Sequence, residues 1–146
     1  KTWKFGALHS IQIDLNQQTW ELYDYLPKVP GSEEVFKNRP YYVVGEAEGM
    51  TALIQFADHK TIYAVMEMGK LVLVQISTSL ESLIDFLNEA ELLWIDHQCK
   101  ISLPLTNDNL NYAKSIIEAF ALANPEANTN FLEDLCFAGL NMGFPL

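Results

Sequence analysis

The first half of the chain alternates between apolar and polar residues with the period of two that is typical of half-buried β-strands. Residues 10–15 (SIQIDL) and 19–23 (TWELY) show this alternation on either side of the polar turn NQQ, and together they predict a β-hairpin. Residues 27–40 carry three prolines and a glycine. We predict a loop there, because proline cannot donate a backbone hydrogen bond within a central strand.

Four further β-rich runs follow in close succession, and only short turns with aspartate or glycine separate them. Because no helix fits between these runs, they predict an antiparallel meander. The run at residues 71–77 is apolar at nearly every position, which predicts burial on both faces beneath a packed helix. The four runs are residues 41–47, 51–57, 61–67 and 71–77.

The second half of the chain changes to the spacing of amphipathic helices. Residues 79–93 and 107–123 each place apolar side chains on one side at helical spacing, and the second segment stops where Pro125 forbids continuation. Residues 130–141 predict a shorter third helix that ends near Gly143.

Strands first and helices afterwards are typical of the α+β class. We therefore predict a single domain, residues 1–146, with an antiparallel (mixed) sheet of about six strands over residues 9–77 and two to three packed helices over residues 78–143. The apolar content of 49% is that of a globular protein. No apolar run approaches the roughly 20 residues that a membrane helix needs, so no membrane association is predicted.

The formal net charge of −10 narrows the classes of function. It argues against nucleic-acid binding, which needs a basic face to neutralise phosphates, and it leaves simple solubility or a basic protein partner. Cys99 and Cys136 form no CxxC pair and are predicted to be buried thiols of a cytoplasmic protein, although a disulfide between them stays open. The chain begins at Lys1, so upstream residues, including a targeting segment, also stay open.

Three hydroxyl residues, at positions 77–79, stand between the last β-rich run and the first helical segment. Thr78 and Glu81 have the spacing of a capping box, in which the hydroxyl and the carboxylate each accept a backbone N–H at the helix start. A catalytic serine needs a neighbouring base and an oxyanion hole, and no GxSxG or SxxK motif occurs here. We therefore predict a structural role for the hydroxyls and no catalytic residues in the chain.

Glu81, Asp85 and Glu89 form a carboxylate stripe on the first predicted helix, because they recur every four residues. Like charges at this spacing destabilise a helix by about 0.2–0.5 kcal/mol per pair, and no base stands nearby in the sequence to compensate. The stripe is either a solvated face or a negative surface for a positively charged partner. Glu91 falls toward the apolar side of the same helix, which predicts fraying there.

Few other residues are candidates for catalysis or metal binding. An acid–base set could be drawn from Asp58 and His59 with Glu46 or Asp14, but Asp58 and His59 are better explained as turn residues. The three histidines show no metal-ligand spacing, so we predict no metal site and no cofactor.

Three short motifs follow one another in the order residues 42–45 (YVVG), 58–63 (DHKTIY) and 77–87 (STSLESLIDFL). This order resembles the SUKH superfamily, and most closely its immunity-protein branch, over residues 5–93. The chain departs from that pattern at Ser77, where the branch often has asparagine, and at Leu83, where it often has phenylalanine. The helical segment that usually precedes the sheet in the family is also missing from this sequence.

The resemblance implies a non-enzymatic α+β domain whose bacterial relatives bind a cognate toxin, often a nuclease, and block it. We therefore predict a cytoplasmic immunity protein that neutralises a toxin with a basic surface; the oligomeric state stays open. One alternative is a general regulatory or scaffold module of the same fold. Another is a small hydrolase or ligand-binding domain around Asp14, His9 or His59. The predicted partner-binding residues are all acidic: Glu81, Asp85, Glu89, Glu46 and Glu48.

Overall fold

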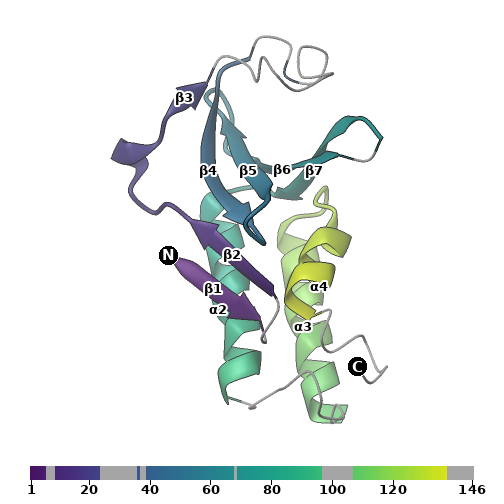
Figure 1. The fold of residues 1–146 in the computed structure, drawn as a ribbon. Helices are drawn as coiled ribbons and strands as arrows, with labels where there is room; N and C mark the ends of the chain where they lie inside the picture. Colours follow the sequence, from purple (N-terminus) through teal and green to yellow (C-terminus); the bar gives the residue numbers. More distant parts are fainter. Residues whose placement is uncertain (6–8, 24–35, 37–38, 68, 97–106, 138–146) are drawn as a thin grey trace.

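The computed structural model describes residues 1–5, 9–23, 36, 39–67, 69–96 and 107–137 (Figure 1). It shows an α+β fold, in which a seven-stranded antiparallel sheet is followed by three helices. The strands are β1 (Thr2–Phe5), β2 (His9–Ile13), β3 (Leu22–Tyr23), β4 (Tyr41–Ala47), β5 (Thr51–Phe56), β6 (Ile62–Glu67) and β7 (Leu71–Ser77). The helices are α2 (Leu80–Asp96), α3 (Asn107–Ala123) and α4 (Thr129–Phe137), and a short 3-10 helix, η1 (Gln17–Thr19), precedes β3. None of the helices described here is both long and apolar enough to cross a bilayer.

The sheet confirms the predicted meander and adds a strand to it. Six strands follow the spatial order β1-β2-β4-β5-β6-β7, and the short β3 pairs with the start of β4. Strands β4 to β7 coincide with the four β-rich runs of the sequence. The sheet begins at β1 rather than at residue 9, since β1 pairs with β2 along its whole length.

The predicted hairpin of residues 10–15 and 19–23 is wrong. Strands β2 and β3 do not pair with each other, because each pairs with a different part of β4. Polar side chains form local hydrogen bonds in the connection between these strands. Asn16 Oδ1 accepts the backbone N–H of Gln18 at 3.2 Å, and the Thr19 hydroxyl donates to Asp14. These hydrogen bonds favour the 3-10 turn η1 over a tight hairpin turn.

Apolar clusters cover both faces of the sheet. The larger cluster joins one face to all three helices, and the smaller one lies on the opposite face around Tyr41. Strand β7 contributes to both, with Leu71 and Leu73 in the smaller cluster and Val74 and Ile76 in the larger one. This confirms that the last β-rich run is packed on both of its faces.

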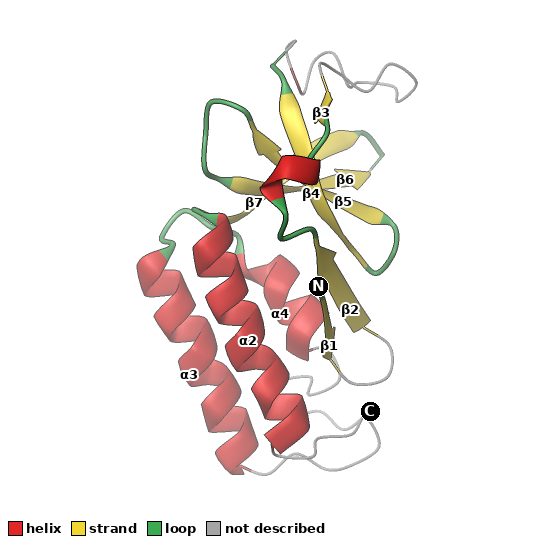
Figure 2. Cartoon of the chain, turned by 90° about the vertical axis from the view of Figure 1, so that its left-hand side faces the viewer, coloured by secondary structure: helices red, strands yellow, loops and turns green. Residues whose placement is uncertain are grey.

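Helix α2 lies between α3 and the β1–β2 pair (Figure 2). Two hydrogen bonds attach it to β1: Trp3 Nε1 donates to Asn88 Oδ1, and the Lys4 backbone N–H donates to Glu91 Oε2, both at 2.8 Å. The predicted fraying at Glu91 is therefore wrong, because this carboxylate binds the edge of a strand that the sequence pattern did not predict. The helix continues to Asp96.

The far end of α2 is attached to α4. The indole N–H of Trp94 donates to the Cys136 carbonyl oxygen at 2.8 Å. Cys136 is a buried free thiol, as predicted, and its burial raises the pKa of the thiol well above the usual range. Cys99 and the predicted helix end near Gly143 lie outside the described residues.

Candidate functional site

The hydroxyl residues at the junction of β7 and α2 contact the protein's own polar groups. Ser77 is fully buried, and its hydroxyl donates to the Ser79 carbonyl oxygen at 2.7 Å. The Ser79 hydroxyl accepts the backbone N–H of Ser82 at 3.1 Å, so Ser79 is the residue that caps α2. The predicted capping box of Thr78 and Glu81 is therefore wrong, because Thr78 is not the cap and the backbone N–H of Ser79 donates to Ser77 Oγ at 3.4 Å instead of to a carboxylate.

Asn124, at the end of α3, explains why Thr78 does not cap the helix. Its side chain is 1% exposed, and Oδ1 accepts both the backbone N–H and the hydroxyl of Thr78, at 2.8 and 2.7 Å. Its Nδ2 donates to Ser82 Oγ at 2.8 Å and to the Phe120 carbonyl oxygen at 3.0 Å. A buried amide needs such partners. Because the Thr78 hydroxyl is bonded to Asn124, Ser79 is the residue that caps α2.

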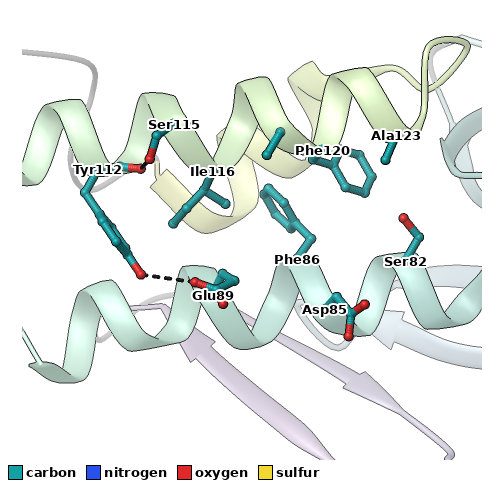
Figure 3. A pocket seen from close by; sticks show the side chains of 10 residues that line it. Ser82, Asp85, Phe86, Glu89, Tyr112, Ser115, Ile116, Phe120 and Ala123 are labelled. Atoms are coloured by element: carbon teal, nitrogen blue, oxygen red, sulfur yellow. Dashed lines mark hydrogen bonds between the residues drawn. The ribbon is translucent and has the colours of Figure 1, made fainter.

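A groove of about 440 Å³ runs between α2 and α3 (Figure 3). Its floor is apolar and contains Phe86 of α2 with Ile116 and Phe120 of α3, all of which are largely buried. The rings of Phe86 and Phe120 lie in contact, with centroids 4.8 Å apart. The groove is therefore a shallow opening over the packed core between the two helices.

The α2 rim of the groove is acidic. Asp85 and Glu89, one helical turn apart, are exposed and border the opening. Glu89 Oε2 accepts the Tyr112 hydroxyl at 3.1 Å, which closes one end of the groove (Figure 3). Glu81 is exposed one turn before Asp85, outside the groove lining. Among the described residues, no lysine, arginine or histidine lies within ion-pair distance of these three carboxylates.

The α3 rim is lined by small residues, Ser115, Ala119 and Ala123, which recur every four residues. The Ser115 hydroxyl donates to the Tyr112 carbonyl oxygen of its own helix at 2.7 Å. At the other end, Ser82 Oγ is engaged with Asn124. The hydroxyl groups around the groove are thus satisfied by the protein, and the two carboxylates are its charged groups open to a partner.

The remaining two predicted partner-binding residues lie elsewhere. Glu46 is exposed on β4 and borders neither this groove nor the one described next. Glu48 is in the β4–β5 turn, where its Oε1 lies 2.6 Å from His9 Nδ1. It borders a second groove, of about 430 Å³, with Met50 and Phe131 among its lining residues. The structure therefore brings Asp85 and Glu89 together and leaves Glu46 and Glu48 apart from them.

The residues of the alternative acid–base set are also dispersed. Asp58 pairs with Arg39 at 3.1 Å, and this hydrogen bond lowers the pKa of the carboxyl. Asp14 accepts the Thr19 hydroxyl and the Asn16 N–H, which lower its pKa in the same way. The two carboxyls thus stabilise turns in different parts of the molecule. No group of three metal-ligating side chains occurs in the described part of the chain.

Comparisons of the chain with protein-family models, with characterised proteins and with solved structures give no match. The resemblance to the SUKH superfamily therefore stays a prediction.

Proposed function

We propose that this chain is a protein-binding domain of the immunity type, which neutralises a cognate bacterial toxin by direct contact. The observation that supports the proposal best is the α2 rim of the groove. Asp85 and Glu89 are exposed there, have no basic partner among the described residues, and stand beside an apolar floor. A basic side chain from a partner would neutralise them while its carbon atoms cover the floor.

The electrostatics of the whole chain support the same partner chemistry. The net charge of −10 produces a negative field around the molecule, and such a field attracts a basic partner over long range. A nuclease toxin has a basic substrate-binding face, because it must hold phosphates. Complementary charge of this kind raises the association rate and rejects partners of the wrong sign.

The other two functions receive less support. A small hydrolase around Asp14, His9 or His59 receives less support, because Asp14 and His59 border neither groove and His9 lines the second groove without either of them. A general regulatory module would use the same groove. A toxin gene directly upstream of this gene favours the immunity role, and the absence of such a gene favours the regulatory one.

The test is to isolate the partner from the native host by pull-down and to measure its association with charge-reversed variants. The double variant Asp85→Lys/Glu89→Lys should lower the association rate constant about tenfold or more at low salt, and its rate should depend less on salt. Stopped-flow fluorescence across a salt series measures both effects.

The matched control is Glu118→Lys/Glu126→Lys, which changes the net charge equally at two exposed positions outside the groove. We expect this control to retain most of the association rate. Equal rates for the two double variants would mean that only the net charge matters, and the groove would lose its role in the proposal.

A further inference from the structure

The groove has the length of a short helix. Along α3 its lining extends from Tyr112 to Ala123, a stretch of twelve residues that covers about 16 Å of helix, or about three turns. The volume of about 440 Å³ is too large for one side chain and lies within the range of roughly 300–1,000 Å³ that is typical of ligand sites. An occupant that fills it therefore contributes several side chains from one continuous segment.

Among the described residues that line it, the groove has few free hydrogen-bonding groups for the backbone of an extended peptide. Its walls are two helices, whose backbone groups are paired within each helix. The hydroxyls of Ser82, Ser115 and Tyr112 are already bonded within the protein. An extended segment buried here would leave its own N–H and C=O groups without partners, at a considerable cost in free energy. A helix meets those needs internally.

The rims also suit a helix. The small side chains of Ser115, Ala119 and Ala123, one turn apart along α3, allow another helix backbone to approach closely. Leu122, the residue before Ala123, is 85% exposed and adds apolar surface on α3 outside the groove lining. Only the α2 rim carries charge, so the two edges of the groove differ in chemistry.

We propose that the groove binds a short amphipathic α-helix of the partner, which packs its apolar side on Phe86, Ile116 and Phe120. Lysine or arginine residues on one edge of that helix, three or four positions apart, face Asp85 and Glu89, which are themselves one turn apart. This inference rests on the proposed function, because it names the part of the toxin that the groove recognises.

The test uses two synthetic peptides of about 18 residues, long enough to form a helix with assistance from the groove. Both contain the same leucines, alanines and lysines. In the first peptide the leucines form one helical face with lysines at i and i+4 along its edge; in the second the order is permuted so that no such face exists. Fluorescence anisotropy with the full chain measures affinity, and amide chemical shifts locate the peptide.

We expect the amphipathic peptide to bind at least about tenfold more tightly than the permuted one. Its amide shifts should be confined to residues 82–89 and 112–123. Equal affinity of the two peptides would show that charge alone is recognised and would overturn the helix proposal. Shifts that lie outside the groove would overturn it as well.

A filled groove provides the second test. The substitution Ala119→Phe places a large ring at an exposed position on the rim, and we expect it to weaken the amphipathic peptide about tenfold or more. Glu118→Phe is the matched control, because it adds the same ring at the neighbouring exposed position outside the groove. Circular dichroism and thermal unfolding check that both variants keep the fold.

The same variants separate the two proposals. In one outcome, charge reversal at Asp85 and Glu89 slows association of the native partner but Ala119→Phe does not weaken its binding. The acidic rim would then be confirmed as part of the interface, and the proposed helix in the groove would be wrong. If Ala119→Phe blocks the peptide but charge reversal leaves the native partner unaffected, the groove binds helices and the proposed function fails.

Discussion

Two neighbouring regions of this molecule are rich in polar side chains. The side chains of one region are bonded within the protein, whereas those of the other are exposed to solvent. At the β7–α2 junction, the hydroxyls of residues 77–79 and the amide of Asn124 are bonded to one another and to the backbone. On the groove rim, Asp85 and Glu89 remain exposed beside apolar surface. Ser82 belongs to both regions, since it binds Asn124 and borders the groove.

The difference shows how structural polar groups can be told from those available to a partner. Most buried polar groups are satisfied within a protein, because an unpaired one costs about 1–3 kcal/mol. Exposed carboxylates one turn apart are unfavourable for their helix, and no basic side chain of the described residues neutralises Asp85 or Glu89, although Glu89 accepts the Tyr112 hydroxyl. Polar groups of the first kind are explained by the fold, whereas those of the second kind point to something outside it.

The largest effect on stability is expected from Asn124→Leu. This change leaves the half-buried N–H and hydroxyl of Thr78 without their acceptor, and it should lower the free energy of unfolding by about 2–4 kcal/mol. Urea denaturation measures the change. Asn128→Ala is the comparison variant, because it removes only the acceptor for the Asn130 N–H at the start of α4 and should cost about 1 kcal/mol. If both variants lost the same free energy of unfolding, the hydrogen bonds of Asn124 at the β7–α2 junction would be no more important for stability than an ordinary helix cap.

A smaller effect should identify the residue that caps α2. Ser79→Ala removes the acceptor for the Ser82 N–H and should cost about 1 kcal/mol. Glu81→Ala should change the free energy of unfolding by less than about 0.5 kcal/mol, because this exposed carboxylate is not part of a capping box here. The opposite ranking in thermal unfolding would restore the capping box predicted from the sequence.

The smallest expected effect concerns the groove rim. Asp85→Asn/Glu89→Gln removes both pairs of like charges at i and i+4, Glu81–Asp85 and Asp85–Glu89, and should stabilise the domain by a few tenths of a kcal/mol per pair. The same double variant should bind the amphipathic peptide more weakly, as measured by fluorescence anisotropy. A variant that is both more stable and a poorer binder is the signature of residues kept for a partner, whereas a loss of stability would assign them a structural role.

Most of the fold could be predicted from the hydrophobic pattern. The β4–β7 meander follows from local alternation, and the three helices follow from their apolar spacing. The sequence pattern could not show that β2 and β3 each pair with β4 and not with each other, because a long connection separates both strands from β4. β1 has only four residues, and its place beside β2 depends on contacts with α2 far along the chain.

The candidate site was predictable only in part. The spacing of Asp85 and Glu89 shows the charged stripe, but not that α3 lies beside it to form a groove. The recurrence of Ser115, Ala119 and Ala123 is a signal present in the sequence, although it gains meaning only once the neighbour is known. Asn124 is recognisable only as the residue before a proline, because its partner Thr78 is 46 positions away.

Helix α2 is held on several sides, and this has a consequence for the speed and strength of recognition. Asn88 and Glu91 bind β1, Trp94 binds α4, and Ser82 binds Asn124. A surface fixed in this way already has its bound shape before any encounter, so the domain loses little conformational entropy when the complex forms. The loss of conformational entropy on binding then falls mainly on the incoming segment. Its own helix propensity would therefore set the affinity of the complex.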